Sequence, residues 1–599
     1  MSQQQNNDMQ QHFYRASAAD FMGIPGSVIA YWASKKSIES FKKFKSFQSV
    51  GNPRLPMTTG DNARFMRLWH EVDYHDLGVG YSSRTESKLS KKKWFPCNKG
   101  GSFRRWYGNN LYVVDWFDDG RRILELNTEL YGSPSRNVRS MDCYFLESIT
   151  WSSISSSTFS ARYSPQGFLF ATGGSCAFPD KYNVLPLLAM LLSKVTLYML
   201  NFLSPTLNFE VGTVGALPLV ESFNKPEVIN VCQKIIELAK HDWDSKETSW
   251  EFFSPINNIG RLYERPIINS IYKKVRENWL ETTLEMQRLE EENNRLFIEA
   301  YGLQDELTPE VPLSEITLTC NPHYRYGGNL SNEEREARLQ SDTIAELISY
   351  AIGCMMGRYS LDREGLVYAH AGNEGFKALV EEGAYVTFAA DEDGILPLST
   401  DSWFADDVAT RLEAFVCTVW GKETLEENLQ FIADSLCLSA IKPVKKGGET
   451  SRETLRRYLS TQFFKDHLKT YKKRPIYWLF SSGKEKAFEC LVYLHRYNES
   501  TLPRMRTEYV TPLLGQMASR IERKRMEQTE ASTAEAKRIG KEIDSLTKQL
   551  AELRAFDDQL KHHADMRIQL DLDDGVKVNY GKFGTLLSDV KAITGDKGE

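Results

Sequence analysis

The chain has 599 residues, which is too many for a single hydrophobic core, so we expect several domains. With 41% hydrophobic and 26% charged residues, the composition fits an ordinary soluble globular protein. The formal net charge of -6 excludes a global basic field, so any contact with nucleic acid must come from local basic patches.

The nine cysteines are scattered singly, with no Cys-x-x-Cys pair. This argues against a structural zinc site and a disulfide framework, and it indicates a reducing cytoplasm. The start of the chain is rich in Gln and Asn rather than basic and then apolar, so it does not resemble a signal peptide. The most apolar run, Val184 to Leu203, is interrupted by Pro186 and Lys194 and predicts a buried helix, not a membrane span.

Residues 1–50 are expected to form a disordered tail and linker. Met1 to Gln11 is polar and low in complexity, which is typical of disorder. Further on, lysines between Lys35 and Lys45 interleave with Ile38 and Phe41 and predict an amphipathic helix with a basic face. A solvated face is the favoured interpretation, and a face that follows phosphates is the alternative.

Residues 51–220 are predicted to form one mixed α/β module. Leu111 to Trp116 and Phe168 to Thr172 are rich in β-branched and aromatic residues and predict strands. Leu185 to Phe202 predicts a helix. We expect an α+β multidomain fold in which this module precedes a mostly helical C-terminal region.

Cations and aromatic rings alternate between Lys91 and Asn110. Cations on flexible stems neutralise phosphates, and flat rings stack on bases. The pattern therefore predicts DNA-binding residues, namely Lys91, Lys92, Lys93, Trp94, Lys99, Arg104, Arg105 and Trp106. The alternative from composition is a solvated basic loop with its aromatic residues tucked into a core.

Irregular polar segments of the same module supply candidates for reading bases. Arg suits guanine, and Asn suits adenine, because each makes two hydrogen bonds to one base edge. The candidates flank Gly132, Pro134 and a serine-rich run, and they are Arg136, Asn137, Arg139 and Arg162. The alternative is that they pair with nearby acids such as Asp142 and Glu147.

The rest of the chain is divided into a helical spacer (221–330), a C-terminal α+β domain (331–500), a long helical-hairpin or coiled-coil-like element (501–566) and a tail expected to fray (567–599). In the long element an apolar seam is interrupted by Asp557 and comprises Ile539, Ile543, Leu546, Leu550, Leu553 and Leu560. The acids near Glu381 and Asp391 are interpreted as solvated loop residues rather than a metal site.

Several long strings occur together in one order. They are TTGDNARFMRLW (from Thr58), KKWFPCNKGGSFRRWYGN, ITWSSISSSTFSARYSPQGFLFATGGS and NFLSPTLNFEVGTVGALPLV. This series resembles the target-recognition region of large adenine-specific DNA methyltransferases, with the PglX type of BREX phage-defence systems as the best match, and single-chain restriction–modification enzymes share the layout. Later strings such as YAIGCMMGRYSLDREGLVYA resemble the same family.

Two motifs that such an enzyme needs are missing. The glycine-rich turn for S-adenosylmethionine has only weak counterparts at Gly78–Gly80 and Phe170–Gly174. The Asn/Asp-Pro-Pro-aromatic string that holds a flipped adenine has only Asn321 to Tyr324, with His323 in place of the second proline. A phosphate loop at Ser481–Lys484 is rejected because Trp478 stands where a glycine is required.

In the resembling family both catalytic motifs lie upstream of the recognition region. The resemblance therefore implies a C-terminal half that recognises DNA, carries no catalytic, cofactor or metal residue, and is inactive alone. It would be an expressed fragment, a truncated gene or one half of a split enzyme. The complete enzyme would use S-adenosylmethionine, and the expected partners are double-stranded DNA, a methyltransferase catalytic domain or subunit and other defence-system proteins. One alternative is a separate specificity subunit. Another is an enzyme with an unrecognised site, such as a nuclease, although the missing motifs count against it.

Overall fold

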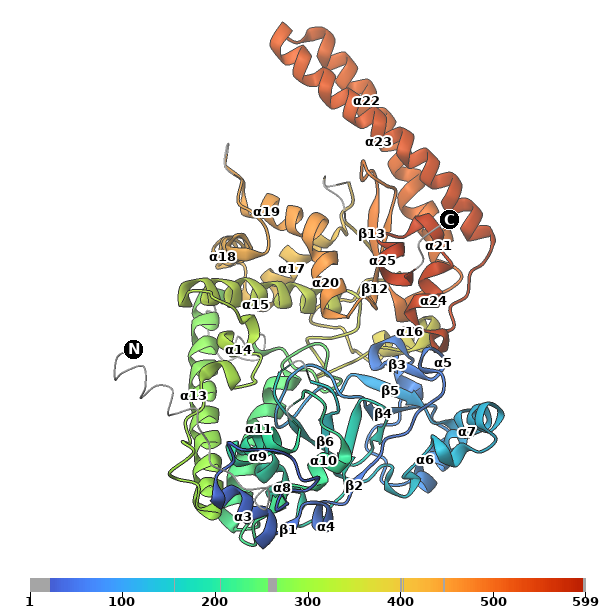
Figure 1. Ribbon diagram of the computed structural model, residues 1–599. Helices are drawn as coiled ribbons and strands as arrows, with labels where there is room; N and C mark the ends of the chain where they lie inside the picture. Colours follow the sequence, from blue (N-terminus) through green and yellow to red (C-terminus); the bar gives the residue numbers. More distant parts are fainter. Residues whose placement is uncertain are drawn as a thin grey trace, which may run out of the picture. The chain divides into compact units, whose positions relative to one another are not determined.

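The computed structural model describes residues 22–155, 157–204, 206–256, 267–398, 401, 403–444 and 448–595, so the predicted disordered tail Met1–Gln11 lies outside these ranges. Many helices and several small sheets confirm the predicted mixture of helix and strand (Figure 1). The chain forms two compact units of interleaved segments. Unit 1 comprises Met1–Arg67, Asp76–Trp243 and Asn278–Asn329, and unit 2 comprises Leu68–His75, Asp244–Glu277 and Leu330–Glu599.

Unit 1 contains two four-stranded sheets and a two-stranded one. The first sheet is antiparallel in the order β2-β9-β6-β7, from β2 (Pro53–Arg54), β6 (Ser148–Ser152), β7 (Ala161–Ser164) and β9 (Gly174–Ala177). The second has the order β3-β5-β4-β8, from β3 (Met66–Leu68), β4 (Trp94–Asn98), β5 (Tyr112–Asp115) and β8 (Leu169–Phe170). The third pairs β1 (Lys45–Ser46) with β10 (Pro218–Leu219).

The core of unit 1 lies on the second sheet. Its strands are short apolar runs, and Phe95, Val114 and Leu169 are fully buried in one cluster with Phe145 and Phe170. Helices surround the sheets, namely α3 (Lys35–Lys43), α4 (Gln48–Gly51), α5 (Asn62–Phe65), α6 (Arg84–Ser90), α7 (Phe117–Tyr131), α8 (Val184–Leu191), α9 (Lys194–Leu203), α10 (Val211–Gly215), α11 (Pro226–Asp244) and α14 (Pro322–Tyr326).

The helix predicted over Leu185–Phe202 is two helices. A break at Ser193, whose hydroxyl oxygen accepts the amide hydrogen of Thr196 (3.4 Å), separates α8 from α9. Within the described ranges no single helix is long and apolar enough to cross a membrane. Helices α8 and α9 reach the required length and apolar composition only together, and the pair is bent by 66°. The helical spacer predicted over 221–330 contains the long helix α13 (Ile268–Tyr301), whose residues belong in part to each unit.

Unit 2 places its helices around one antiparallel sheet with the order β11-β13-β12, formed by β11 (Ile395–Pro397), β12 (Tyr477–Ser481) and β13 (Glu489–Tyr493). Its helices before the C-terminal arm are α15 (Asn332–Met355), α16 (Phe376–Glu381), α17 (Val408–Trp420), α18 (Leu425–Ser439), α19 (Ser451–Tyr458), α20 (Phe464–Thr470) and α21 (Thr501–Arg504). Asp393, predicted to be solvated, is instead largely buried beside Asp391, and burial raises its pKa to about 7.

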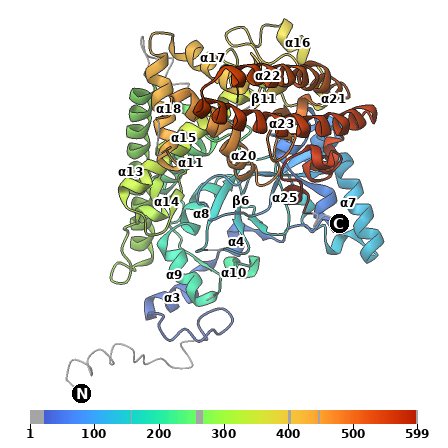
Figure 2. The same cartoon turned by 90° about the horizontal axis from the view of Figure 1, so that it is seen from above.

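The element predicted over 501–566 contains two long helices, α22 (Thr511–Glu530) and α23 (Thr533–Asp565), which lie side by side in both views (Figures 1 and 2). All seam residues of α23 are buried except Ile543, which is half-buried. Asp557 interrupts the seam because it accepts two hydrogen bonds from Arg506 (2.7 and 3.1 Å). Glu552 binds the turn that resembled a phosphate loop, with Oε1 2.7 Å from the hydroxyl of Ser482.

The predicted fraying of residues 567–599 is corrected as far as residue 595. Helices α24 (Gly575–Gly581) and α25 (Val590–Thr594) fold there, and Tyr580 and Phe583 are fully buried. The ring of Trp478 in β12 lies 5.1 Å from that of Tyr580, centroid to centroid. Aromatic burial of this kind offsets the entropy of ordering a chain end.

Candidate nucleic-acid interface

The cations Lys91, Lys92 and Lys93 follow α6 at the surface of unit 1. Helix α6 begins after Ser83, whose hydroxyl caps it, and ends at Lys91, whose backbone is left-handed (φ 58°). Lys91 is exposed, while Lys92 and Lys93 are half-buried, and Lys93 Nζ lies 5.5 Å from the ring centroid of Trp94. Trp94 is itself buried in β4, so the prediction that its ring stacks on a base is corrected.

The second half of the predicted patch lies inside unit 1, which corrects the expectation that it faces nucleic acid. Arg104 Nη2 lies 2.9 Å from Asp242 Oδ2 in α11, and these side chains are 3% and 2% exposed. Arg105 Nη1 lies 2.7 Å from Glu290 Oε2 in α13, and Trp106 Nε1 donates to Glu290 Oε1 (2.8 Å). These residues therefore fasten two helices to the sheet region rather than binding phosphates.

The two buried carboxylates differ in electrostatics. Burial alone would raise the pKa of Asp242, but Arg104 and the amide hydrogens of Thr319 and Cys320 outweigh it and hold that pKa below its usual value. For Glu290 burial prevails, so its pKa is raised even though Arg105 stabilises the charged form. Each carboxylate depends on its arginine, because a buried charge without a partner is costly.

Arg162 is also internal, which corrects its assignment as a base reader. It is 1% exposed, and its guanidinium donates to the carbonyl of Arg104 (3.2 Å) and the hydroxyl of Ser152 (3.4 Å). Burial lowers its pKa to about 10. The acids considered as its partners, Asp142 and Glu147, instead contact an arginine of β2 and a tyrosine of β7.

Two glycine turns press against each other beside this buried arginine. A Cβ on Gly100 would lie 2.4 Å from the carbonyl oxygen of Gly173, and one on Gly174 would lie 2.5 Å from the carbonyl oxygen of Asn98. Gly100 and Gly173 both have positive φ (78° and 102°). The glycines are thus needed for close approach of β4 to the β8–β9 turn. Lys99, which precedes Gly100, is half-buried, and this burial lowers its pKa.

The loop after α7 presents the other base-reading candidates. Arg136 and Arg139 are exposed, and Asn137 is half-buried. The carbonyl oxygen of Asn137 accepts the amide hydrogen of Thr58 (2.9 Å), and its Nδ2 donates to Oδ1 of the buried Asn127 in α7 (3.0 Å). The structure therefore joins this loop to the start of the TTGDNARF string and fixes the backbone beneath the two arginines.

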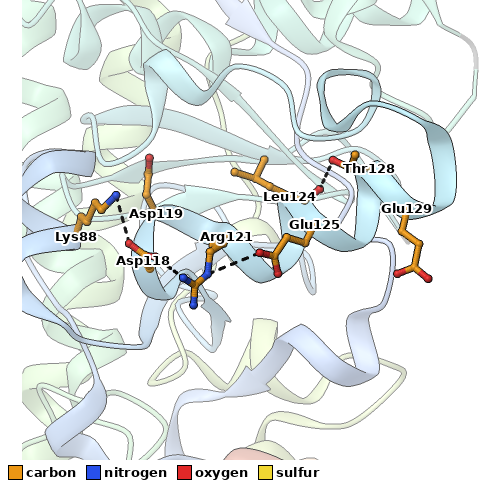
Figure 3. A pocket seen from close by; sticks show the side chains of 8 residues that line it. All are labelled: Lys88, Asp118, Asp119, Arg121, Leu124, Glu125, Thr128 and Glu129. Atoms are coloured by element: carbon orange, nitrogen blue, oxygen red, sulfur yellow. Dashed lines mark hydrogen bonds and ion pairs between the residues drawn. The ribbon is translucent and has the colours of Figure 1, made fainter.

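A groove that the sequence did not predict lies between α6 and α7, with a volume of about 620 Å³. At the start of α7, Asp118, Asp119 and Gly120 have left-handed backbones (φ 50°, 60° and 76°), which is strained for the two aspartates. Figure 3 shows Asp118 between two cations, with Lys88 Nζ 3.3 Å and Arg121 Nη1 3.2 Å from its carboxylate. The only sequence signal was the charge-dense run DDGRR after a strand.

Asn321 to Tyr324, the string nearest to an adenine-binding motif, stabilises the local fold. Asn321 Oδ1 accepts the amide hydrogen of His323 (3.1 Å) and caps α14, while Nδ2 donates to the carbonyls of Leu313 (2.7 Å) and Ile316 (2.8 Å). All its polar atoms are thus engaged in the fold. Among the residues that the structure describes, no group of three or more His, Cys, Asp or Glu side chains is placed to hold a metal ion.

No family model matches the chain. It is 50% identical over 589 residues to the adenine-specific methyltransferase BrxX of Escherichia coli O9:H4 (strain HS). It is 39% identical over 592 residues to the adenine-specific methyltransferase PglX of Lacticaseibacillus casei (strain Zhang). The chain is similar to adenine-specific methyltransferases. Each match covers 97% of this chain but 46% of the relative, so the chain spans less than half the length of these relatives.

Proposed function

We propose that this chain is the DNA-recognition part of a site-specific adenine-N6 DNA methyltransferase of a BREX-type phage-defence system. The observation that carries the proposal is the 50% and 39% identity, over 97% of the chain, to two adenine-specific methyltransferases. The sequence lacks both the S-adenosylmethionine turn and the adenine-binding string. The methyl donor and the reacting adenine would accordingly be held by the part of such an enzyme that this chain does not contain.

The surface of unit 1 supplies the groups that recognition needs. Lys91 to Lys93 would neutralise phosphates and set the position of the duplex. Arg136 and Arg139 would then read base edges, because both arginines are exposed while the side chain of Asn137, which donates to Asn127, holds their loop on α7. The buried arginines act indirectly, since they hold the sheet region that carries these loops.

In the complete enzyme the recognised duplex would present one adenine to the methyltransferase part, which must flip that base out of the stack to reach its amino group. The product would be a methyl mark that distinguishes host DNA from phage DNA. The partners of this chain are then double-stranded DNA, the methyltransferase part and other proteins of the defence system.

Duplex binding as a function of salt tests the proposal. Each phosphate contact contributes roughly 0.9 to the slope of log K against log salt concentration. Changing Lys91, Lys92 and Lys93 to Ala together should flatten that slope by up to about 2.7 and weaken binding to all sequences about equally. An unchanged slope and affinity would show that these lysines take no part in DNA binding.

Lys42, Lys43 and Lys45 provide the matched control. They are three exposed lysines within four positions of the same unit, and their change to Ala removes the same charge. The proposal predicts that this control keeps most of the wild-type slope. Equal losses in the two triple variants would contradict a special role of the surface after α6, because net charge or the basic face predicted between Lys35 and Lys45 would then account for binding as well.

A further inference from the structure

Asn127 is a polar side chain of α7 that lies in the interior of unit 1, next to the loop of residues 134–139, the arginine loop. It is 0% exposed. Its Oδ1 accepts a hydrogen from Nδ2 of Asn137 (3.0 Å), and its Nδ2 donates to the backbone carbonyls of Thr59 (3.0 Å) and Ile123 (2.9 Å). One side chain thus joins α7 to two segments that lie elsewhere in the sequence.

These partners fix which end of the Asn127 amide is the oxygen. The opposite orientation would place its oxygen against two carbonyl oxygens and would leave the amide hydrogen of the Asn137 side chain without an acceptor. Aspartate has no hydrogen to donate, leucine has no polar atom, and glutamine is longer by one methylene group. The site therefore depends on the hydrogen-bonding pattern of asparagine and not only on its volume.

The turn of residues 58–60 lies against the same loop. The amide hydrogen of Thr58 bonds to the carbonyl oxygen of Asn137 (2.9 Å). Gly60 has a left-handed backbone (φ 85°), and a Cβ at this position would lie 3.4 Å from Nδ2 of Asn127. The turn and the arginine loop are thus held together both directly and through Asn127.

The arginine loop is also braced internally. Nε of Arg139 donates to the carbonyl oxygen of Arg136 (2.6 Å). The carbonyl oxygen of Arg139 accepts the hydroxyl hydrogen of Tyr144 (2.7 Å), which is 2% exposed. The two arginines are therefore placed by the backbone between them, and Asn137, which lies in that stretch, is the residue that Asn127 holds.

Reading a base edge demands accurate placement, because two hydrogen bonds to one base must both have good geometry. A phosphate contact by a lysine on a flexible stem tolerates displacement better. On the basis of the proposed function, we propose that Asn127 is a positioning residue for sequence recognition, which holds the arginine loop and the turn of residues 58–60 on α7. Its loss should weaken discrimination between sequences more than it weakens binding to DNA in general.

Changing Asn127 to Leu removes the three hydrogen bonds at nearly constant volume. The measured quantity is the ratio of the affinity for the sequence that the wild-type chain selects to the affinity for random duplex. This ratio should fall about tenfold, and the preference should relax at the base positions that Arg136→Ala and Arg139→Ala also relax. Affinity for random duplex should change less than about twofold, because the phosphate contacts remain. An unchanged ratio in the folded variant would overturn the proposal.

Asn293 provides the matched control. This asparagine of α13 is also 0% exposed, and its Nδ2 donates to the carbonyl oxygen of Ala189 in α8 (2.9 Å). Asn293→Leu should reduce stability but leave the affinity ratio and the selected sequence unchanged, because its partner does not belong to the arginine loop. An equal fall of the ratio in this control would contradict a specific role of Asn127.

Asn137→Ala tests the same link from the loop side if Asn127→Leu does not fold, since it removes only a half-buried amide. If Asn137 anchors the loop, the relaxed base positions are again those of the arginine variants. Relaxation at a different position, as expected if Asn137 itself reads a base, would overturn the proposal, and so would an unchanged selection. A wild-type chain that enriches no sequence would refute the proposed function, and this role of Asn127 with it.

Discussion

Arg104 and Asp242 form an ion pair of 2.9 Å in the interior of unit 1, although 138 positions separate them in the sequence. Asp242 also accepts the amide hydrogens of Thr319 (2.7 Å) and Cys320 (2.9 Å). One carboxylate therefore connects three distant segments, and Arg104, which the sequence predicted to bind DNA, instead stabilises the interior of unit 1.

Changing Arg104 to Met should destabilise unit 1 by about 3–5 kcal/mol, because it leaves a buried carboxylate without its cation. The salt slope of DNA binding should be unchanged under conditions where the variant is folded, since Arg104 contacts no phosphate. Lys91→Met should do the opposite, changing stability by less than about 0.5 kcal/mol while flattening the slope by roughly 0.9. Thermal unfolding and DNA titration measure both. A flatter slope in the folded Arg104 variant would refute this assignment.

Unit 2 should lose stability as the pH falls from 6.5 to 5. Burial, aided by Arg358, lowers the pKa of His467 and His495 to about 3, and that of His70 well below 6.5. These histidines stay neutral in the folded state and take up protons only when the chain unfolds, so acid favours unfolding. Burial raises the pKa of Glu247 to about 7, so this group binds a proton in the folded state in the same window and offsets one of the three.

Asp393, whose pKa burial also raises to about 7, offsets a second proton in the same window. The net difference is then one proton, or at most about 1.4 kcal/mol of stability lost per pH unit. Urea unfolding followed by hydrogen exchange in β12 and β13 checks this. Glu247→Gln removes one of the two offsets, so its loss of stability on acidification should be steeper than that of the wild type. A stability that does not change between pH 6.5 and 5 would contradict the assigned neutral histidines.

The purified chain is expected to show no measurable binding of S-adenosylmethionine, because it lacks the glycine-rich turn and its glycine pair at 173–174 packs against the end of β4. Isothermal titration calorimetry checks this, with a complete relative such as the BrxX protein as the positive control. A stoichiometric micromolar site for S-adenosylmethionine on this chain would contradict the proposal that the cofactor binds to another part of the enzyme.

The sequence predicted the strands β5 and β8 and the helical spacer that contains α13, because each is a local pattern of burial. It did not predict where Arg104 and Arg105 lie, since a basic-aromatic run looks the same whether its partners are phosphates or distant carboxylates. Asp242 and Glu290, which decide the matter, carry no local signal of pairing. Gly173 stood in a stretch that the sequence offered as a weak glycine-rich turn, but its contact with Gly100 depends on the parallel pairing of β4 with β8.

Lys91, Arg136 and Arg139, which the sequence offered as DNA-binding candidates, are exposed in the structure, as is common for cations in irregular segments that need no long-range partner. Arg162 stood in a similar polar context and proved internal, because it lies in the edge strand β7, which pairs with β6 on one side and is bridged to Trp106. The groove beside Asp118 was missed, since it arises from packing of α6 on α7 and from left-handed backbone that two aspartates rarely adopt.

Selection of binding sites from a random duplex pool tests the central claim, recognition of a specific DNA sequence, most directly. The wild-type chain should enrich one short asymmetric sequence. Arg136→Ala or Arg139→Ala should cost about 1–3 kcal/mol on that site and relax the preference at one base position. Arg288→Ala, at an exposed arginine of α13, should leave the enriched sequence unchanged. No enrichment by the wild-type chain, or the same enriched sequence from all four proteins, would contradict the account.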